Sequence, residues 1–427
     1  MSLRLSALLV CLASGMTSVA WGQGRMTSAT GPSLESMSYG LQGISPHNGP
    51  VGAKLGESAL FHAALGADVG YDSNVFYQTT PKSAAVAHVT PAVDLSNGER
   101  DGTEPDGVFY DLGASLTYRE YLTGGDAVRK MRAFSPSVGG LLRFSSKQTL
   151  SLTLSENFYR TQDPSYSETA PVITHDRNQA SVELKVAPGG GRIQLLLRYN
   201  NVLDLYETSG YDKSNNMGNE GVIDVSWRWL PKTAFFMQVA QGAITYLKSD
   251  SGRIASYPLR ATAGLRGLLT EKLGLNLAVG YANGFYASGG TPSGFGNVVL
   301  VAEIIYNMTL TSKVGLGYRH DFQNSPFIGN FYNLDAGYAA LREFIGGRVA
   351  TAAYGRFENR RYQGAIQGRT DQVAIAGLTA DYVIQRVFYI GVGYTLTLAR
   401  SNNTDPATNG GVDFTKHLLV GRLGIVY

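Results

Sequence analysis

The chain has 427 residues, of which 44% are hydrophobic, 11% aromatic and only 16% charged. Soluble globular proteins carry about 25% charged residues, so this low charge, together with 52 glycines and 25 tyrosines, is unusual for that class. A formal net charge of +3 excludes the strongly basic proteins, and no nucleic-acid partner is expected.

The first residues predict a secretory signal peptide over residues 1–22. Arg4 supplies the positive start, residues 7–13 form the apolar run, and 18–20 are small residues of a cleavage pattern. Cleavage after residue 20 and cleavage after residue 22 fit equally well. The only cysteine, Cys11, lies in this segment, so disulfides and cysteine metal sites are excluded in the mature chain.

The segment that follows, residues 23–57, is rich in Gly, Ser and Pro and lacks sustained alternation. We expect it to be a flexible periplasmic tail. No long uninterrupted apolar run follows the signal, so no transmembrane helix is predicted. Residues 58–427 are expected to form one β-barrel domain.

From Leu60 onward, apolar and polar residues alternate in segments that are joined in turn by short and by long connections. The short turns recur roughly every forty residues, and longer Asn-, Ser-, Asp- and Gly-rich loops lie between them, as in outer-membrane barrels. The expected strands are 59–73, 84–95, 107–122, 131–146, 149–162, 177–187, 191–205, 218–230, 233–247, 257–269, 273–287, 296–310, 313–324, 330–345, 348–362, 370–384, 387–400 and 414–427.

This pattern predicts an all-β fold, a transmembrane antiparallel up-and-down β-barrel of 18 strands, with 16 as the alternative count. A pair of soluble β-sandwiches or a β-propeller is the soluble alternative. Trp227 and Trp229, just before the turn at Pro231, are expected in an interfacial aromatic belt.

Many charged residues fall on the polar side of these strands. A basic residue facing lipid at mid-bilayer costs about 2–4 kcal/mol, so we expect them to face the lumen, the space that the barrel encloses. Two interpretations stay open. The charges either pair across neighbouring strands and hold the shape of the wall, or they provide an electrostatic path for a charged or hydroxyl-rich solute. The lumen-facing candidates are Asp111, Arg119, Arg198, Asp224, Arg228, Arg266, Glu303, Arg319, Asp321, Asp335, Arg356 and Glu358.

The sequence contains no pattern typical of an enzyme. Its six histidines are scattered without ligand spacing, and Gly-x-Ser-x-Gly, His-Glu-x-x-His and phosphate-loop patterns are missing. We therefore expect neither catalysis nor a metal or cofactor.

The C-terminus alternates outward through Leu423 and Ile425 and closes on the aromatic Tyr427. It resembles the signal by which the barrel-assembly machinery recognises outer-membrane barrels, although Arg422 stands where that pattern prefers glycine. The resemblance implies assembly into the outer-membrane lipid of a Gram-negative cell.

The end of the first expected strand carries a short motif, Gly70-Tyr71-Asp72-Ser73-Asn74-Val75-Phe76. It resembles the signature of the β-barrel porin type 2 family. Members of that family resemble outer-membrane components of exopolysaccharide or capsule secretion. The resemblance implies a barrel over residues 58–427, export of polysaccharide, and a periplasmic polysaccharide-export protein as partner. The motif residues are Gly70, Tyr71, Asp72, Ser73, Asn74 and Phe76.

In that role, Tyr121, Tyr159 and Tyr354 are expected to give a passing polysaccharide weak stacking contacts. One alternative is a general diffusion porin for small hydrophilic solutes. Another is a closed structural or adhesive barrel that acts through its outer loops.

Overall fold

The computed structural model describes residues 52–56, 59–97, 107–145, 149–162, 173–208, 210–248, 253–287, 296–325, 331–363, 368–384, 387–404 and 413–427. The expected signal peptide and nearly all of the expected tail lie outside these residues. β1 (Ala53–Leu55) falls within the expected tail and pairs with the start of β2.

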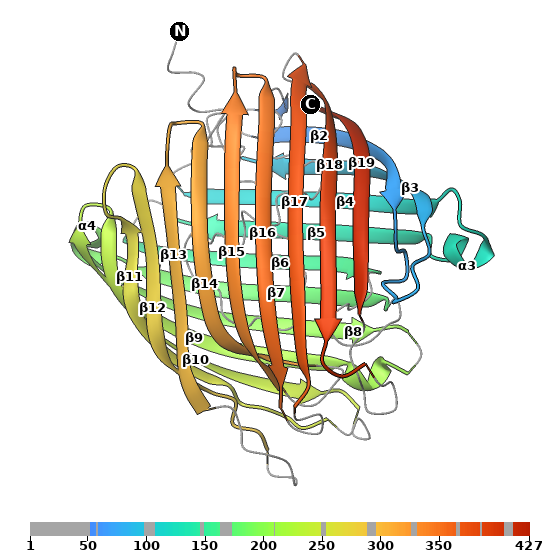
Figure 1. Cartoon of the computed structure of the whole chain (residues 1–427). Helices are drawn as coiled ribbons and strands as arrows, with labels where there is room; N and C mark the ends of the chain where they lie inside the picture. The colour runs from blue at the N-terminus through green and yellow to red at the C-terminus, as the bar shows by residue number, and fades with distance from the viewer. Residues whose placement is uncertain are drawn as a thin grey trace.

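One antiparallel sheet contains the 19 strands of the described residues, and 18 of them, β2 to β19, form the closed wall of a barrel (Figure 1). The prediction of an 18-stranded antiparallel barrel is confirmed. The wall strands are β2 (Ala59–Asp72), β3 (Ala84–Ser96), β4 (Val108–Tyr121), β5 (Ala133–Phe144), β6 (Leu150–Thr161), β7 (His175–Val186), β8 (Ile193–Tyr206), β9 (Asn216–Leu230), β10 (Thr233–Tyr246), β11 (Leu259–Leu268), β12 (Leu273–Asn283), β13 (Gly296–Asn307), β14 (Ser312–Asn324), β15 (Phe331–Ile345), β16 (Val349–Tyr362), β17 (Thr370–Ile384), β18 (Phe388–Ser401) and β19 (Phe414–Val426).

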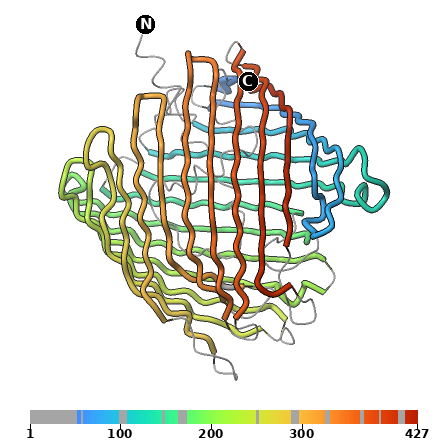
Figure 2. Tube along the Cα trace, viewed as in Figure 1, coloured from blue at the N-terminus to red at the C-terminus, as the bar shows by residue number. Residues whose placement is uncertain are grey.

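The barrel closes where the last strand pairs with the first long one. β19 runs antiparallel to β2, from Leu418 opposite Asp72 to Val426 opposite Ala64. Beyond this register, Ala63 and Tyr427 exchange backbone hydrogen bonds of 3.0 and 2.8 Å. Figure 2 shows the red C-terminal strands beside the blue N-terminal ones. This pairing removes the free edges that an open sheet would leave.

The two ends of the barrel differ. Short connections such as 231–232 and 346–348 lie at the end where Tyr427 terminates, whereas longer connections lie at the opposite end. One of the longer ones, between β4 and β5, contains α3 (Asp126–Arg129). The other helices within the described ranges are α4 (Pro188–Gly191) and the 3₁₀ turn η2 (Asp212–Ser214). Among the described residues no helix is both long and apolar enough to span a membrane.

The two faces of the wall have inverted polarity compared with a soluble protein. Large apolar side chains are exposed on the outer face, and Leu316 and Leu423 are each 60% exposed. Charged side chains are buried on the inner face, where Glu303 is only 1% exposed. A barrel in a bilayer needs this arrangement, because its outer face contacts acyl chains.

Aromatic side chains on the outer face form two groups. On β4, Tyr118 lies eight positions after Tyr110, which is about 26 Å along a strand. This spacing is comparable to the apolar band of about 25 Å between the aromatic girdles of outer-membrane barrels. The group near the short turns contains Tyr110, Trp227, Trp229, Phe235, Tyr306 and Phe388. The group farther along the strands contains Tyr71, Tyr118, Tyr199, Tyr281, Tyr318 and Tyr394.

The motif at the end of β2 connects the first and last wall strands. Asp72 accepts a hydrogen bond from the Asn74 backbone N–H (3.0 Å) through one oxygen and from Lys416 Nζ (2.7 Å) through the other. The Asn74 amide donates to the carbonyl oxygens of Gln78 (2.7 Å) and Thr415 (3.2 Å). Ser73 Oγ accepts the backbone N–H of His417, which lies beside Lys416, at 2.7 Å. The motif therefore stabilises the closure of the barrel.

We expect Asn74→Ala to weaken this closure. The side chain is fully buried, and its loss leaves backbone groups of Gln78 and Thr415 without their partners. Such a loss costs about 1–3 kcal/mol. The temperature at which the refolded barrel loses its fast mobility in detergent gels should fall. Asn297→Ala, at an exposed position on β13, is the control. Equal unfolding temperatures for the two variants would contradict this role.

Candidate functional site

The candidate functional site is the inner wall, and the strand register defines which residues belong to it. Residues directly opposite each other on antiparallel strands point to the same face. One such row runs from Arg266 through Asn276, Glu303 and Gly317 to Tyr338. Asn276 Nδ2 donates to Glu303 at 2.7 Å, and the Tyr338 hydroxyl donates to its other oxygen.

Gly317 allows the Tyr338 ring to reach Glu303 across the intervening strand. A Cβ at this position would lie 2.2 Å from the ring, so any other residue would displace the tyrosine. Sequence reasoning missed Asn276 and Tyr338 as members of the inner wall. A glycine opposite a tyrosine would indicate such a contact, but the sequence shows that these two residues are opposite each other only once the strand register is known.

Most of the lumen-facing candidates share the face of this row. The register places eleven of the twelve on it. They come from β4, β8, β9, β11, β13, β14 and β16, and so surround much of the lumen. These eleven residues are Asp111, Arg119, Arg198, Asp224, Arg228, Arg266, Glu303, Arg319, Asp321, Arg356 and Glu358.

Asp335 is the exception, and its expected position is corrected. It pairs across the strands with His320, on the face that carries the exposed Tyr318. His320 Nδ1 lies 2.7 Å and the Tyr318 hydroxyl 2.8 Å from its carboxylate. The neighbouring residues Ala336 and Gly337 are both small, so the sequence around Asp335 does not distinguish an apolar face from a polar one. Because these residues lie toward the long-loop end of the wall, the outer face there tolerates polar groups.

Charged residues of the inner wall pair with charges on the adjacent strand or across one intervening strand. Arg266 donates two hydrogen bonds to Asp224, at 3.0 and 2.7 Å, and Arg198 Nε donates to Glu183 at 2.8 Å. Arg422 Nε lies 2.6 Å from Asp381. These contacts support the first interpretation, that the charges stiffen the wall.

A cluster of three charges on β16 has an excess of positive charge. The Glu358 carboxylate accepts hydrogen bonds from Arg360 Nε (2.7 Å) and forms a salt bridge with Arg356. All three side chains are buried, at less than 10% exposure. One carboxylate thus holds two guanidinium groups together.

The long-loop end of the lumen is narrowed by connections that fold inward. Val75, after β2, and Val128, in α3, are buried against Val86 and Tyr121. The last two belong to the inner face of β3 and β4. The connections that follow β2 and β4 therefore pack against the inner face at this mouth of the barrel.

Tyr77 extends this inward packing to the other side of the closure. It packs against the inner-face residues Val373, Ala399 and Phe414, and its ring lies 5.3 Å from that of Phe414. Lys416 Nζ lies 3.9 Å from the centre of the Tyr77 ring. The aqueous path at this end is consequently narrower than the ring of strands.

The tyrosines expected to stack on a polysaccharide are only partly available. Tyr121 and Tyr159 are on the inner face but buried, and the Arg119 guanidinium lies 5.6 Å from the Tyr121 ring centre. Tyr354 is half-buried. For the first two rings the expectation of stacking is corrected, because neighbouring side chains cover them.

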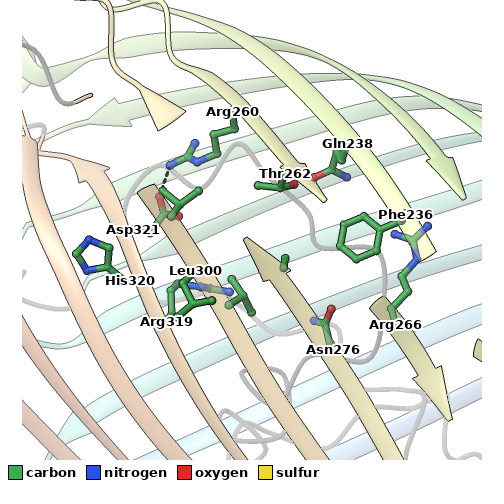
Figure 3. A pocket seen from close by; sticks show the side chains of 13 residues that line it. Phe236, Gln238, Arg260, Thr262, Arg266, Asn276, Leu300, Arg319, His320 and Asp321 are labelled. Atoms are coloured by element: carbon green, nitrogen blue, oxygen red, sulfur yellow. Dashed lines mark hydrogen bonds and ion pairs between the residues drawn. The ribbon is translucent and has the colours of Figure 1, made fainter. Parts of the chain in front are cut away.

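A hollow opens in the inner wall between β10 and β14 (Figure 3). It combines three arginines with amide, hydroxyl and aromatic side chains. Among the described residues no group of His, Cys, Asp or Glu is arranged to hold a metal ion. The polar inner-face residues that line the hollow are Gln238, Arg260, Thr262, Arg266, Asn276, Arg319 and Asp321.

No protein-family model matches the sequence, and no curated protein matches it. Solved structures are similar in fold at low identity. Pseudomonas aeruginosa OccK2 (OpdF) is 13% identical with a TM-score of 0.46, covering 86% of this chain and 98% of that chain. OccK5 (OpdH) of the same organism is 10% identical, with a TM-score of 0.44 and the same coverages. The P. aeruginosa ferric enterobactin receptor PfeA is 8% identical, with a TM-score of 0.44, covering 86% and 80%.

We expect Glu358→Gln to destabilise the barrel strongly. The substitution keeps the shape of the side chain but removes the buried negative charge that Arg356 and Arg360 share. Breaking a buried pair in this way costs about 3–5 kcal/mol. Urea unfolding of the protein refolded into lipid vesicles should show it. Glu343→Gln, on the exposed face of β15, is the control, and an equally small change in both variants would contradict the role of the cluster.

Proposed function

We propose that this chain is a passive channel of the Gram-negative outer membrane for small hydrophilic solutes. The observation that carries the proposal is the closed wall of 18 strands, apolar outside and charged inside. A barrel of eight strands is filled by its own side chains, whereas 16 to 18 strands leave an aqueous channel. The exposed outer face needs lipid around it, and the signal peptide and C-terminal pattern are the expected means of reaching that membrane.

The charges of the inner wall support a water-filled lumen. The side chains of Arg266, Glu183 and Asp381 remain about one-fifth exposed although they are paired. Ionised groups are not left beside an empty apolar space, because the desolvation would be too costly. Water in the lumen solvates them, and a hydrophilic solute shares that water.

Polysaccharide export is the second candidate, favoured by the resemblance of the β2 motif to its family signature. We rank it after the diffusion of small solutes for two reasons. The motif residues Asp72, Ser73 and Asn74 hold the barrel closed, a need that does not depend on the cargo. Tyr121 and Tyr159, expected to contact a passing polymer, are buried.

Planar-bilayer recording tests the channel itself. The purified, refolded chain should give stepwise, ohmic current increments in a salt solution, because ions follow the same water-filled path as solutes. A closed structural or adhesive barrel gives no such increments. Their absence in vesicles that contain correctly folded protein, as judged by the gel mobility of the closed barrel, would overturn the proposed channel.

Deletion of the gene distinguishes the two cargoes. If small solutes are the cargo, uptake of hydrophilic compounds should fall while the amount of surface polysaccharide stays unchanged. Loss of surface polysaccharide with unchanged uptake would instead support export, together with a periplasmic export protein as partner. Complementation with the intact chain is the control for both measurements.

A further inference from the structure

We propose that the hollow between β10 and β14 is a binding subsite for a hydroxylated solute that carries a carboxylate, such as a uronic acid. The inference rests on the proposed channel, since a permeating solute reaches this wall through the lumen. Figure 3 shows Arg260 and Arg319 toward one side of the hollow and Arg266 toward the other. Thr262 and Gln238 lie between them.

Near Arg266 the hollow presents a guanidinium group rather than a carboxylate to the lumen. The Arg266 side chain is 22% exposed, whereas its partner Asp224 is 2% exposed. Glu303, a second acidic residue near Arg266, is 1% exposed and accepts hydrogen bonds from Asn276 and Tyr338. A solute in the lumen therefore meets positive charge here, although the wall as a whole is nearly balanced.

Two of the arginines are held in place before any solute arrives. The Arg266 guanidinium lies 4.6 Å from the centre of the Phe236 ring while both of its terminal nitrogens bond to Asp224. A planar guanidinium held in this way loses little conformational freedom when it binds a second carboxylate.

Arg260 is fixed by the same combination of contacts at the other side of the hollow. It lies 4.5 Å from the centre of the Phe322 ring. Its Nη2 donates to Asp321 Oδ1 and to the Phe322 carbonyl oxygen, both at 3.1 Å. In contrast to Asp224, Asp321 remains 13% exposed. This side of the hollow is therefore the less positive one, and we assign the carboxylate of the solute to Arg266.

The residues between the arginines fit the hydroxyl groups of such a solute. Gln238 Nε2 donates to Asp224 at 3.3 Å and Asn276 Nδ2 donates to Glu303, which fixes the orientation of both amides. The Thr262 hydroxyl is both donor and acceptor and lies beside Gln238 (Figure 3). Hydroxyl groups of a sugar need such mixed partners. A carboxylate together with several hydroxyls is the chemistry of a uronic acid.

Binding at this subsite has to be weak for a channel to work, since a permeating solute must also leave. The test is therefore a current recording rather than a stable complex. Galacturonate added to single channels should interrupt the ion current in a concentration-dependent manner. Galactose, which has the same hydroxyl pattern without the carboxylate, should do so far less. Equal interruption by both sugars would overturn the assignment.

A charge-balanced variant tests the residues. In the double variant Arg266→Gln with Asp224→Asn the pair is removed without leaving a buried charge, and the galacturonate concentration for half-maximal interruption should rise at least roughly tenfold. The control is Arg198→Gln with Glu183→Gln, which removes a comparable pair at β7 and β8. An unchanged half-maximal concentration in the first variant would overturn the subsite.

The outcome for the subsite is separable from that for the channel. A chain that conducts but ignores galacturonate overturns the subsite and leaves the channel standing. If no current is seen, saturation-transfer NMR of galacturonate with the folded, detergent-solubilised protein tests the subsite directly. Signal transfer that the Arg266/Asp224 double variant abolishes supports the subsite even then, and no transfer from the intact chain overturns it.

Discussion

The closure of β19 onto β2 is the interaction on which the other features of the wall depend. Lipid offers no hydrogen bonds, so every backbone N–H and C=O group within the bilayer must find its partner in the chain. An open sheet of these strands would leave two unpaired edges. The antiparallel register from Asp72 to Ala64 removes both, and the side-chain contacts of Asn74 and Lys416 secure the end of that register.

Once the sheet is closed, the two-residue period of the strands separates two solvents. Every second side chain contacts acyl chains, and the others share a confined volume with water. Charges on the inner side are then close to each other, and pairs such as Arg266 with Asp224 follow from that crowding. Glycine has a distinct use here, because at Gly317 the missing side chain gives Tyr338 room to cross a strand and reach Glu303.

The sequence predicted the barrel well because both of its signals are local. Alternation and turn composition act over a few residues, and together they yield the strand number. The same alternation predicts whether a residue faces the lumen or the outside. It failed at Asp335, because the small neighbours Ala336 and Gly337 weaken the alternation there. The burial of Tyr121 was unpredictable for another reason. Val75 and Val128 cover its surroundings from connections that fold inward, and alternation carries no information about such contacts.

Because the motif lies where the barrel closes, its resemblance to a family signature is weak evidence about which solute the barrel carries. The contacts of this motif join the first wall strand to the last, and they do so whatever passes through the barrel. Selection among solutes has to act where solutes travel, and along the inner wall the exposed guanidinium of Arg266 beside a buried Asp224 is a feature with that capacity. Its neighbours Thr262 and Gln238 belong to strands far from the closure. Closure of the barrel and the proposed selection of solutes therefore involve different residues. The family resemblance around Asn74 concerns closure, whereas the hollow at Arg266 concerns the proposed selection.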